Sequence, residues 1–425
     1  MNCSVREIGD LPPDERAAVF DRDADIEEIR EDVREIVGRV REEGDVAVRE
    51  FTSEFDDVAV GNLDVTDAAA DAVEELDDDV REAIETAADN VRAFHERSAP
   101  ADWREDFEGR ELGRRYRPVE RAGVYVPGGT AAYPSSALMG VIPAKVAGVE
   151  HVAVATPPAD EINPVTLAAV HIAGADAVYQ VGGAQAIGAL AHGTETVDRV
   201  QTVVGPGNRW VTAAKAEVRG EVEIDFLAGP SEIAVLADET ADPELVAADL
   251  VAQAEHDTQA SVVAVTDDAA LAAAVADAVE RQAPERERAD IIEGALENDE
   301  SGVFLARSMP EAVLFVEEYA AEHLAIVAEN DEELLDRIDS AGSVFLGPHS
   351  PVAAGDYASG PNHVLPTGGG AKRYGGLSVD TFLRSTTVQR LDEAALDDLA
   401  ETITTLAEAE GLEAHAESVR KRFDE

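Results

Sequence analysis

Two polar side chains that can bind a metal or transfer a proton stand at the end of a predicted helix. In the stretch VAQAEHDTQASVV, residues 251–263, Gln253 and His256 are three positions apart and therefore share one helix face. Asp242 and Pro243 supply the predicted N-cap and first residue of that helix. An amide and an imidazole at a helix end can bind a ligand, or they can satisfy the last carbonyl groups of the helix. Both interpretations are open at this point.

A second candidate is the adjacent pair Glu322 and His323 in EYAAEHLAIV, directly before a predicted strand. Imidazole titrates near neutral pH and a carboxylate can activate water, so neighbouring acid and imidazole groups suit proton transfer. The alternative is a chance pair on an acidic surface.

A third candidate is the long segment of residues 350–379, SPVAAGDYASGPNHVLPTGGGAKRYGGLSV. It is rich in glycine and proline and nearly free of charge, although 29% of the chain is charged. A neutral loop that carries Asp356, His363 and Lys372 is predicted to be buried against a ligand or a subunit.

A metal site could draw on His256, Asp356 and His415, whose nitrogen and oxygen donors suit zinc. His415 lies with Glu410 in the terminal stretch AEAEGLEAHAESV. These residues are far apart in the sequence, and neither an HExxH nor a CxxC signature is present. Spacing by itself therefore leaves the metal site undecided.

The elements that must position these residues alternate between strands and helices. From residue 121 onward, short valine-rich strands are followed by helices of about three turns, a pattern that predicts mostly parallel sheets covered on both faces. We expect an α/β fold of two Rossmann-like domains with helical N-terminal and C-terminal extensions. The predicted parts are an N-terminal arm, a discontinuous domain, an inserted domain and a C-terminal helical arm: residues 1–24, 25–118 with 231–380, 119–230 and 381–425.

Three glycine turns follow predicted strands in the inserted domain: VPGGT, VGGAQAIG and VGPGNRW. Glycine lets backbone amides approach a ligand, and a helix N-terminus favours phosphate, so three such turns predict a nucleotide or dinucleotide site. The strict G-x-G-x-x-G fingerprint is absent, and glycine needed for turn geometry alone is the alternative.

The charge of the chain is strongly negative, with 34 Lys+Arg against 89 Asp+Glu and a formal net charge of −55. The acids are spread along the whole sequence, which favours a solvated acidic coat suited to a salt-rich cytoplasm over a patch for one basic partner. Clustered basic residues are missing, which argues against nucleic-acid binding.

The remaining composition predicts a cytoplasmic protein. No run of about 18 apolar residues is present, and the N-terminus does not read as a secretory signal. Because Cys3 is the single cysteine, neither an internal disulfide nor a thiolate metal cluster can form.

Taken together, the motifs resemble those of histidinol dehydrogenase, in order, from about Tyr125 to His415. The stretches that carry this resemblance are VYVPGG, VGGAQAIGAL, VGPGN, AGPSE, QAEHD, AEHL, AGDYASGPNHVLPT and EGLEAH.

The resemblance implies an NAD-dependent oxidation of L-histidinol, through bound L-histidinaldehyde, to L-histidine in the final steps of histidine biosynthesis. It also implies one zinc ion per subunit and a homodimer in which the C-terminal arm completes the partner's site. The implied zinc ligands are Gln253, His256, Asp356 and His415. The same four residues, with Ser231, Glu322, His323, His363 and Glu410, match substrate-contacting positions, and Tyr125, Gln185 and Asn208 match NAD-contacting positions.

The resemblance assigns His323 as the base for the alcohol proton and Glu322 as the group that activates water to hydrate the aldehyde. An aldehyde oxidation through a cysteine thiohemiacetal would need a thiol in the site, and none of these motifs contains one. The rival enzyme class is a zinc-dependent hydrolase, in which Glu322 activates water and no hydride moves.

Overall fold

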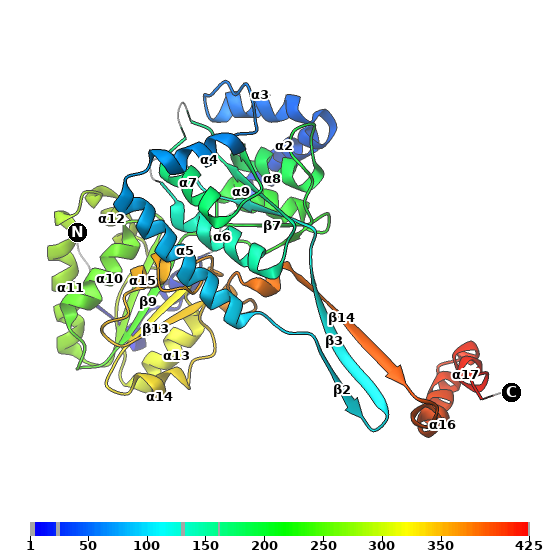
Figure 1. Cartoon of the computed structure of the whole chain (residues 1–425). Coiled ribbons are helices and arrows are strands. Elements are labelled where there is room, and N and C mark those ends of the chain that lie inside the picture. The colour runs from blue at the N-terminus through cyan, green and yellow to red at the C-terminus, as the bar shows by residue number, and fades with distance from the viewer. Residues whose placement is uncertain (1–4, 23–25, 129–131, 160–161, 424–425) are drawn as a thin grey trace. The chain divides into compact units, whose positions relative to one another are not determined.

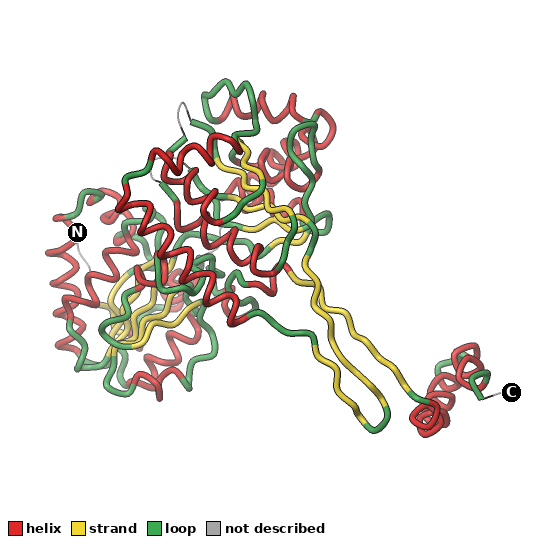
Figure 2. The backbone as a smooth tube through the Cα atoms, viewed as in Figure 1, coloured by secondary structure: helices red, strands yellow, loops and turns green. Residues whose placement is uncertain are grey.

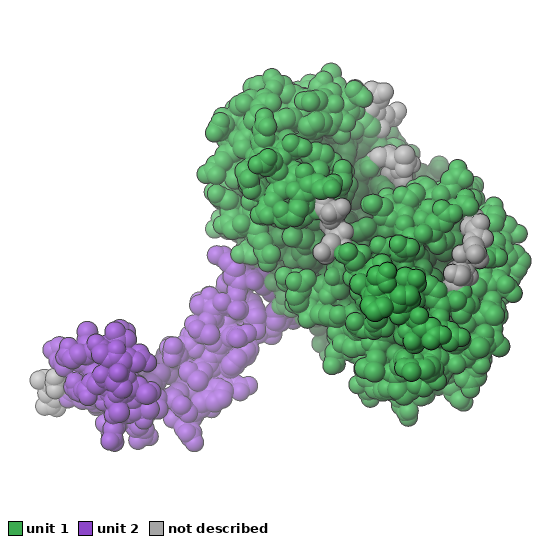
Figure 3. All heavy atoms as spheres, turned by 180° about the vertical axis from the view of Figure 1, so that it is seen from behind, with its two compact units in different colours: residues 1–98, 119–382 green, residues 99–118, 383–425 purple. Residues whose placement is uncertain are grey.

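The computed structural model divides into two compact units, coloured green and purple in Figure 3. The first unit spans residues 1–98 and 119–382, and the second spans residues 99–118 and 383–425. The residues described are 5–22, 26–128, 132–159 and 162–423. Cys3 and Thr130, the last residue of the first glycine turn, lie outside them.

In the first unit, five parallel strands form a sheet in the order β6-β5-β4-β7-β8. The strands are β4 Arg121–Tyr125, β5 His151–Thr156, β6 Ala177–Gln180, β7 Thr202–Val204 and β8 Glu223–Ile224. The connecting helices are α6 Pro134–Ala147, α7 Pro164–Ala173, α8 Gly183–His192 and α9 Arg209–Val218. Figure 1 labels β7 of this sheet and the helices α6 to α9.

Both faces of this sheet are covered, because successive strand residues point to opposite sides. Val124 and Val154 pack on the side of α6 and α7, and Tyr125 and Ala155 pack on the side of α8 and α9. Earlier helices complete the two layers. They are α2 Arg30–Glu43 and α3 Asp45–Phe55 on the α8 side, and α4 Thr66–Glu75 and α5 Asp78–Ser98 on the other.

A second parallel sheet of six strands in the same unit has the order β1-β11-β10-β9-β12-β13. Its strands are β1 Val5–Glu7, β9 Glu232–Ala237, β10 Ser261–Thr266, β11 Gly302–Leu305, β12 His323–Val327 and β13 Ser343–Leu346. One face is covered by α10 Pro243–Ala254, α11 Ala269–Gln282, α12 Ala289–Leu296 and α15 Val352–Tyr357. The other is covered by α1 Pro13–Phe20, α13 Met309–Tyr319 and α14 Asp331–Leu335. Short 3-10 turns complete the unit at Ile8–Asp10, Glu27–Ile29, Ala283–Glu285, Gly370–Lys372 and Val379–Phe382.

The predicted α/β class with parallel sheets is confirmed. Figure 2 shows helices around the strands of both sheets. The domain boundaries stay a prediction. The packing of α2 to α5 on the five-stranded sheet is evidence against grouping residues 25–98 with the later strands. Among the described helices, none has the length and apolar character that a membrane span needs.

The second unit consists of an antiparallel sheet and two helices. The sheet has the order β14-β3-β2, from β2 Trp103–Phe107, β3 Arg110–Pro118 and β14 Leu383–Leu391, and the helices are α16 Glu393–Ala409 and α17 Glu413–Arg420. The sequence analysis predicted the helices but not this sheet. The strands β3 and β14 are far apart in the sequence, so their pairing leaves no local signal. The strands β2 and β3 form a local hairpin through Glu108 and Gly109, which the sequence analysis missed. Large apolar side chains remain exposed on this unit: Trp103, Phe107, Leu406 and Leu412.

The buried His95 of α5 makes the stability of the first unit depend on pH. Its side chain is 1% exposed, and neither ring nitrogen has a hydrogen-bond partner. Burial lowers its pKa from 6.5 to about 4. The unfolded chain therefore binds this proton more readily, and the contribution of His95 to stability is present above pH 6.5 and is lost as pH falls toward 4. From pH 7 to pH 5 the expected loss is about 2 kcal/mol.

We expect His95→Leu to remove this component, because leucine has no proton to bind. Urea unfolding in saline buffer at pH 7 and pH 5 measures the free-energy difference for each protein. The variant should lose about 2 kcal/mol less than the unmodified chain. Equal losses in both proteins would contradict the assignment.

Candidate active site

Gln253 and His256 lie at the C-terminal end of α10. The N-terminus of this helix is built as predicted, because Asp242 accepts a hydrogen bond at 2.9 Å from the backbone two residues on and Pro243 is the first helical residue. Gln253 lies in the last turn and is 2% exposed. His256 lies two residues beyond the helix and is exposed.

The candidate residues gather at the edge where the strands of the six-stranded sheet begin. Ser231 directly precedes β9, and Glu322 directly precedes β12, which pairs with β9 in parallel. Helix α10 follows β9 and packs back along it, so its C-terminal end reaches the same edge. Open α/β sheets usually bind ligands where strands end. The opposite location here explains how residues at a helix end can join the site.

At this edge, His323 faces two carboxylates. Its Nε2 atom lies 3.8 Å from Glu322 Oε1 and 3.8 Å from Asp356 Oδ1. Glu322 and His323 are 7% and 3% exposed, and His323 Nδ1 is buried without a hydrogen-bond partner. The Glu322–His323 pair is therefore a buried acid–imidazole pair, which contradicts the alternative of a chance pair on the surface.

The neutral segment of residues 350–379, predicted as a loop, begins with helix α15, and it supplies Asp356 from this helix and His363 from the loop that follows. His363 Nδ1 lies 2.8 Å from the Asp356 carbonyl oxygen, and its Nε2 lies 3.5 Å from Ser136 Oγ on α6. Asn362 also donates a 2.7 Å hydrogen bond to a backbone carbonyl of α6. Residues 360–370 are buried or half-buried within the chain itself, whereas residues 357–359 and Lys372 are exposed. Burial of this segment against a ligand or a subunit stays a prediction.

Burial shifts the pKa values of this cluster toward the neutral forms. It raises the pKa of Glu322 well above its usual value and that of Asp356 to about 7. It lowers the pKa of His323 to about 3 and that of His363 to about 4. The pKa of His256 is also lowered, mainly because the surrounding protein atoms partly remove its ring from water. Neutral imidazoles can accept protons or bind a metal, and the buried carboxylic acids favour a cation nearby.

The candidates for NAD contacts lie around the glycine turns of the five-stranded sheet. Tyr125 ends β4, and its hydroxyl accepts a 3.2 Å hydrogen bond from Gly183 at the start of α8. Gln185 follows in α8 and is 1% exposed. Asn208 caps α9 by accepting hydrogen bonds of 3.0 and 3.2 Å from the backbone of its first turn. Asn208 therefore already has a structural role, as the N-cap of α9.

A buried ion pair holds the third glycine turn in place. Lys215 forms an ion pair with Asp225, and both side chains are at most 2% exposed. Lys215 Nζ donates to the Gly205 carbonyl at 3.1 Å, and the Gly205 N–H donates to Asp225 at 2.9 Å. Gly205 has φ +113°, and a Cβ there would lie 2.2 Å from the Tyr125 carbonyl oxygen. Only glycine fits this approach between β7 and β4.

Glu410 and His415 belong to the second unit. Glu410 is the C-terminal cap of α16 and His415 lies in α17, and both side chains are exposed there. Within the described residues, no group of three or more His, Cys, Asp or Glu side chains is arranged to hold a metal. A metal site that also uses the amide of Gln253 or a residue of a second chain is compatible with this finding.

Comparison with known proteins decides the family. The family model described as histidinol dehydrogenase matches residues 20–423. The chain belongs to the histidinol dehydrogenase family. The resemblance stated from the sequence motifs is confirmed, and the members of this family are oxidoreductases.

Relatives within this family cover the whole chain. The histidinol dehydrogenase of Haloarcula marismortui is 76% identical over 99% of this chain and 100% of the relative. That of Natronomonas pharaonis is 74% identical over the full length of both. A crystal structure of histidinol dehydrogenase from Elizabethkingia anophelis is 37% identical, with a TM-score of 0.93 over 100% of this chain and 98% of the other.

Several residues of this histidinol dehydrogenase site were missed by the sequence analysis. Glu232 donates its backbone N–H to Glu322 Oε2 at 2.9 Å, and its side chain pairs with Arg22. Ser136 contacts His363. Glu232 stands within AGPSE, one of the stretches that carry the resemblance, whereas Ser136 stands in none of them. Arg22 stands in no motif, and no pattern in the sequence could have found it.

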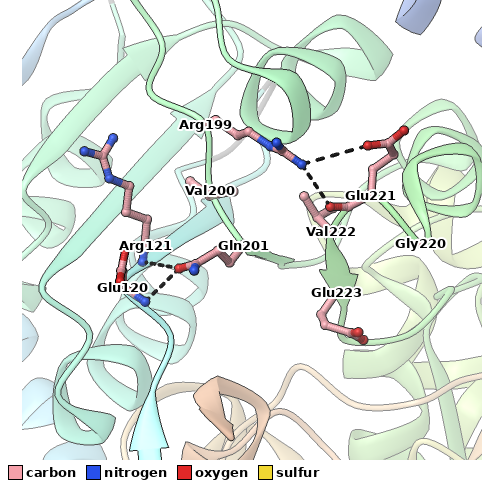
Figure 4. A pocket seen from close by; sticks show the side chains of 9 residues that line it. All are labelled: Glu120, Arg121, Arg199, Val200, Gln201, Gly220, Glu221, Val222 and Glu223. Atoms are coloured by element: carbon pink, nitrogen blue, oxygen red, sulfur yellow. Dashed lines mark hydrogen bonds and ion pairs between the residues drawn. The ribbon is translucent and has the colours of Figure 1, made fainter.

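A separate hollow of about 620 Å³ lies near the amino ends of β4, β7 and β8 (Figure 4) and includes none of the predicted site residues. Both of its arginines are paired with carboxylates. Arg199 contacts the backbone and side chain of Glu221, and Arg121 forms an ion pair with Asp198 at 3.0 Å. We assign this hollow no part in the histidinol dehydrogenase reaction.

Proposed function

We propose that this chain oxidises L-histidinol in two NAD-dependent steps, through bound L-histidinaldehyde, to L-histidine. The family supports the substrate and the oxidoreductase class. The single observation that carries the mechanism is the buried Glu322–His323 pair, with His323 Nε2 at 3.8 Å from both Glu322 and Asp356.

Zinc is the proposed metal, with Gln253, His256, Asp356 and the His415 of a second copy of the chain as ligands. The donor chemistry fits, because neutral imidazoles and a carboxylate are common zinc ligands. Burial by itself raises the pKa of Asp356 to about 7, and a cation beside it would offset the cost of its charge. When bound, zinc would orient the substrate through its nitrogen atoms.

For the first step, His323 is the proposed base. Its Nε2 lies 3.8 Å from the Glu322 carboxylate, which would stabilise the imidazolium that forms when Nε2 accepts the proton of the substrate's alcohol. His363 and Ser231 are proposed to contact the substrate at the same edge of the sheet. His363 is fixed for this role by its contacts with the Asp356 carbonyl and Ser136. NAD held by its proposed contacts would supply the acceptor for the hydride.

For the second step, Glu322 is proposed to take a proton from the water that hydrates the aldehyde. Its Oε2 is held by the Glu232 N–H, which leaves Oε1 directed toward His323. Burial raises the pKa of Glu322, and a divalent cation nearby lowers it again, so the proposed metal would restore the basic form. His323 then assists the second oxidation.

Tyr125, Gln185 and Asn208 are the proposed NAD contacts. They lie beside turns whose backbone amides can approach a phosphate. The hydrogen bonds from Lys215 and to Asp225 hold the backbone of Gly205 in place, which supports a preformed cofactor site.

A homodimer is proposed because the resemblance implies that the C-terminal arm, which carries Glu410 and His415, completes the site of the partner chain. The exposure of Trp103 at 41% and Leu406 at 59% on that unit supports packing against another chain. His256 is exposed on its own unit, as expected for a ligand that another chain covers.

We propose a salt-rich cytoplasm as the working environment. The net charge of −55 and the haloarchaeal relatives support it. The zinc-dependent hydrolase is not favoured, because the family consists of dehydrogenases.

The test is the yield of NADH per L-histidinol in molar salt with zinc. We expect two NADH per substrate, a yield lost on chelation and restored by zinc. One NADH would mean that the aldehyde leaves the site before its oxidation, which would contradict the proposed role of Glu322. No NADH at all would contradict the proposed substrate.

A further inference from the structure

The guanidinium of Arg22 is buried between the first residue of β9 and the last residue of α13. The side chains of Arg22 and Glu232 are 4% and 1% exposed, and Arg22 Nη1 lies 2.5 Å from Glu232 Oε2. Arg22 Nη2 donates to the Tyr319 carbonyl. The guanidinium also lies 3.6 Å from the centre of the Tyr319 ring. Arg22 thus joins two elements that are far apart in the sequence.

These two elements are the ones that place Glu322. The backbone N–H of Glu232 donates to Glu322 Oε2 at 2.9 Å. On the other side, Tyr319 is followed by Ala320 with φ +51°, a left-handed conformation that costs energy for a non-glycine residue. This turn carries the chain from α13 to Glu322, and the bond from Arg22 to the Tyr319 carbonyl holds its first residue.

The Glu232 carboxylate is fixed on both oxygens. Oε2 pairs with Arg22, and Oε1 accepts a 2.7 Å hydrogen bond from the Gly368 N–H in the site loop. The start of β9, the turn after α13 and the loop that contains Gly368 are therefore connected through the buried ion pair of Arg22 and Glu232.

Stability by itself does not explain such a pair. Removing two charges from water is costly, and an apolar pair of similar volume often gives equal or greater stability. The surroundings here would suit an apolar pair, because Phe20, Phe315 and Tyr319 form an aromatic cluster on this side of the sheet.

We propose that Arg22 is a positioning residue for Glu322, which with Glu232 holds the Glu322 carboxylate in place for hydration of the aldehyde. The inference rests on the proposed role of Glu322. A displacement of a reacting group by about 1 Å can cost roughly a hundredfold in rate. Loss of Arg22 should therefore slow aldehyde oxidation more than alcohol oxidation.

The test uses Arg22→Met, Glu232→Gln and the double variant, each as the full-length protein with zinc in saline buffer. Oxidation of L-histidinol and of supplied L-histidinaldehyde is measured separately, together with thermal stability. Arg22→Met alone leaves Glu232 buried without its partner and should be less stable. The double variant removes both charges and should recover stability, while kcat for aldehyde oxidation stays about tenfold to a hundredfold below that of the unmodified protein.

Val19→Ala is the matched control. Val19 is fully buried in the same N-terminal segment, and its truncation leaves a small cavity without touching the ion pair. It should lower stability and leave the ratio of the two rates unchanged. The inference is overturned if the double variant recovers the aldehyde rate along with stability, or if the two rates fall equally.

Glu322→Gln separates this inference from the proposed function. If Glu322→Gln does not slow aldehyde oxidation selectively, the role proposed for Glu322 is wrong. If it does, and the double variant does not, only the inference about Arg22 is wrong.

Discussion

Glu322→Gln is expected to lower the rate of L-histidinaldehyde oxidation by about a hundredfold or more, with a smaller effect on the oxidation of L-histidinol. Glutamine has the shape of glutamate and can still accept the 2.9 Å hydrogen bond from the Glu232 N–H with its carbonyl oxygen. It cannot accept a proton from water. The position of the side chain is therefore kept while its basic function is lost, and only the step that needs activated water should stall.

Single-turnover measurements of NADH formation, started from the alcohol and from the aldehyde, give the two rates. Glu318→Gln is the matched control, because it is the same substitution at a carboxylate that is 50% exposed and pairs with Arg16 at the surface. It should leave both rates unchanged. Equal losses of both rates in Glu322→Gln would mean that Glu322 acts in substrate binding or in folding of the site.

Mixing two variants that each lose oxidation of L-histidinaldehyde is expected to restore that oxidation if the C-terminal arm completes the partner's site. In one variant His415→Asn removes the proposed ligand of the second unit, and in the other Glu322→Gln removes the group of the first unit that is proposed to activate water. A hybrid dimer then has one site with both defects and one site with none. With random pairing, half of the dimers are hybrids, so about a quarter of all sites are intact.

Co-expression with two different affinity tags isolates the hybrid, and its activity and zinc content are measured. Asp356→Asn mixed with Glu322→Gln is the control, because both residues lie in the first unit and no hybrid of them has an intact site. If His415 served the site of its own chain, the first mixture would stay as inactive as the control. His415→Asn should also lose zinc, and an unchanged zinc content would remove it from the ligands.

Local features of the sequence determined the fold class and identified most of the residues of the candidate site. Some signals depend only on neighbouring residues, namely the N-cap Asp242, the proline after it and the valine-rich strands. Such signals can be read without knowledge of the tertiary structure. The pair Glu322 and His323 was recognisable because the two side chains are adjacent. The longer motifs were specific enough to indicate the family, which the comparisons confirmed.

Only the tertiary structure decided where these residues meet and how burial changes them. The site lies where the strands begin, because the end of α10 and the start of β12 reach the same edge of one sheet. The pKa of His323 is lowered to about 3 by burial, and burial is set by elements from distant parts of the chain. Arg22 meets Glu232 and Tyr319 across more than two hundred residues of sequence. The pairing of β3 with β14 likewise joins segments that are far apart in the sequence. Contacts of this kind depend on how the whole chain packs, so no local pattern of residues could predict them.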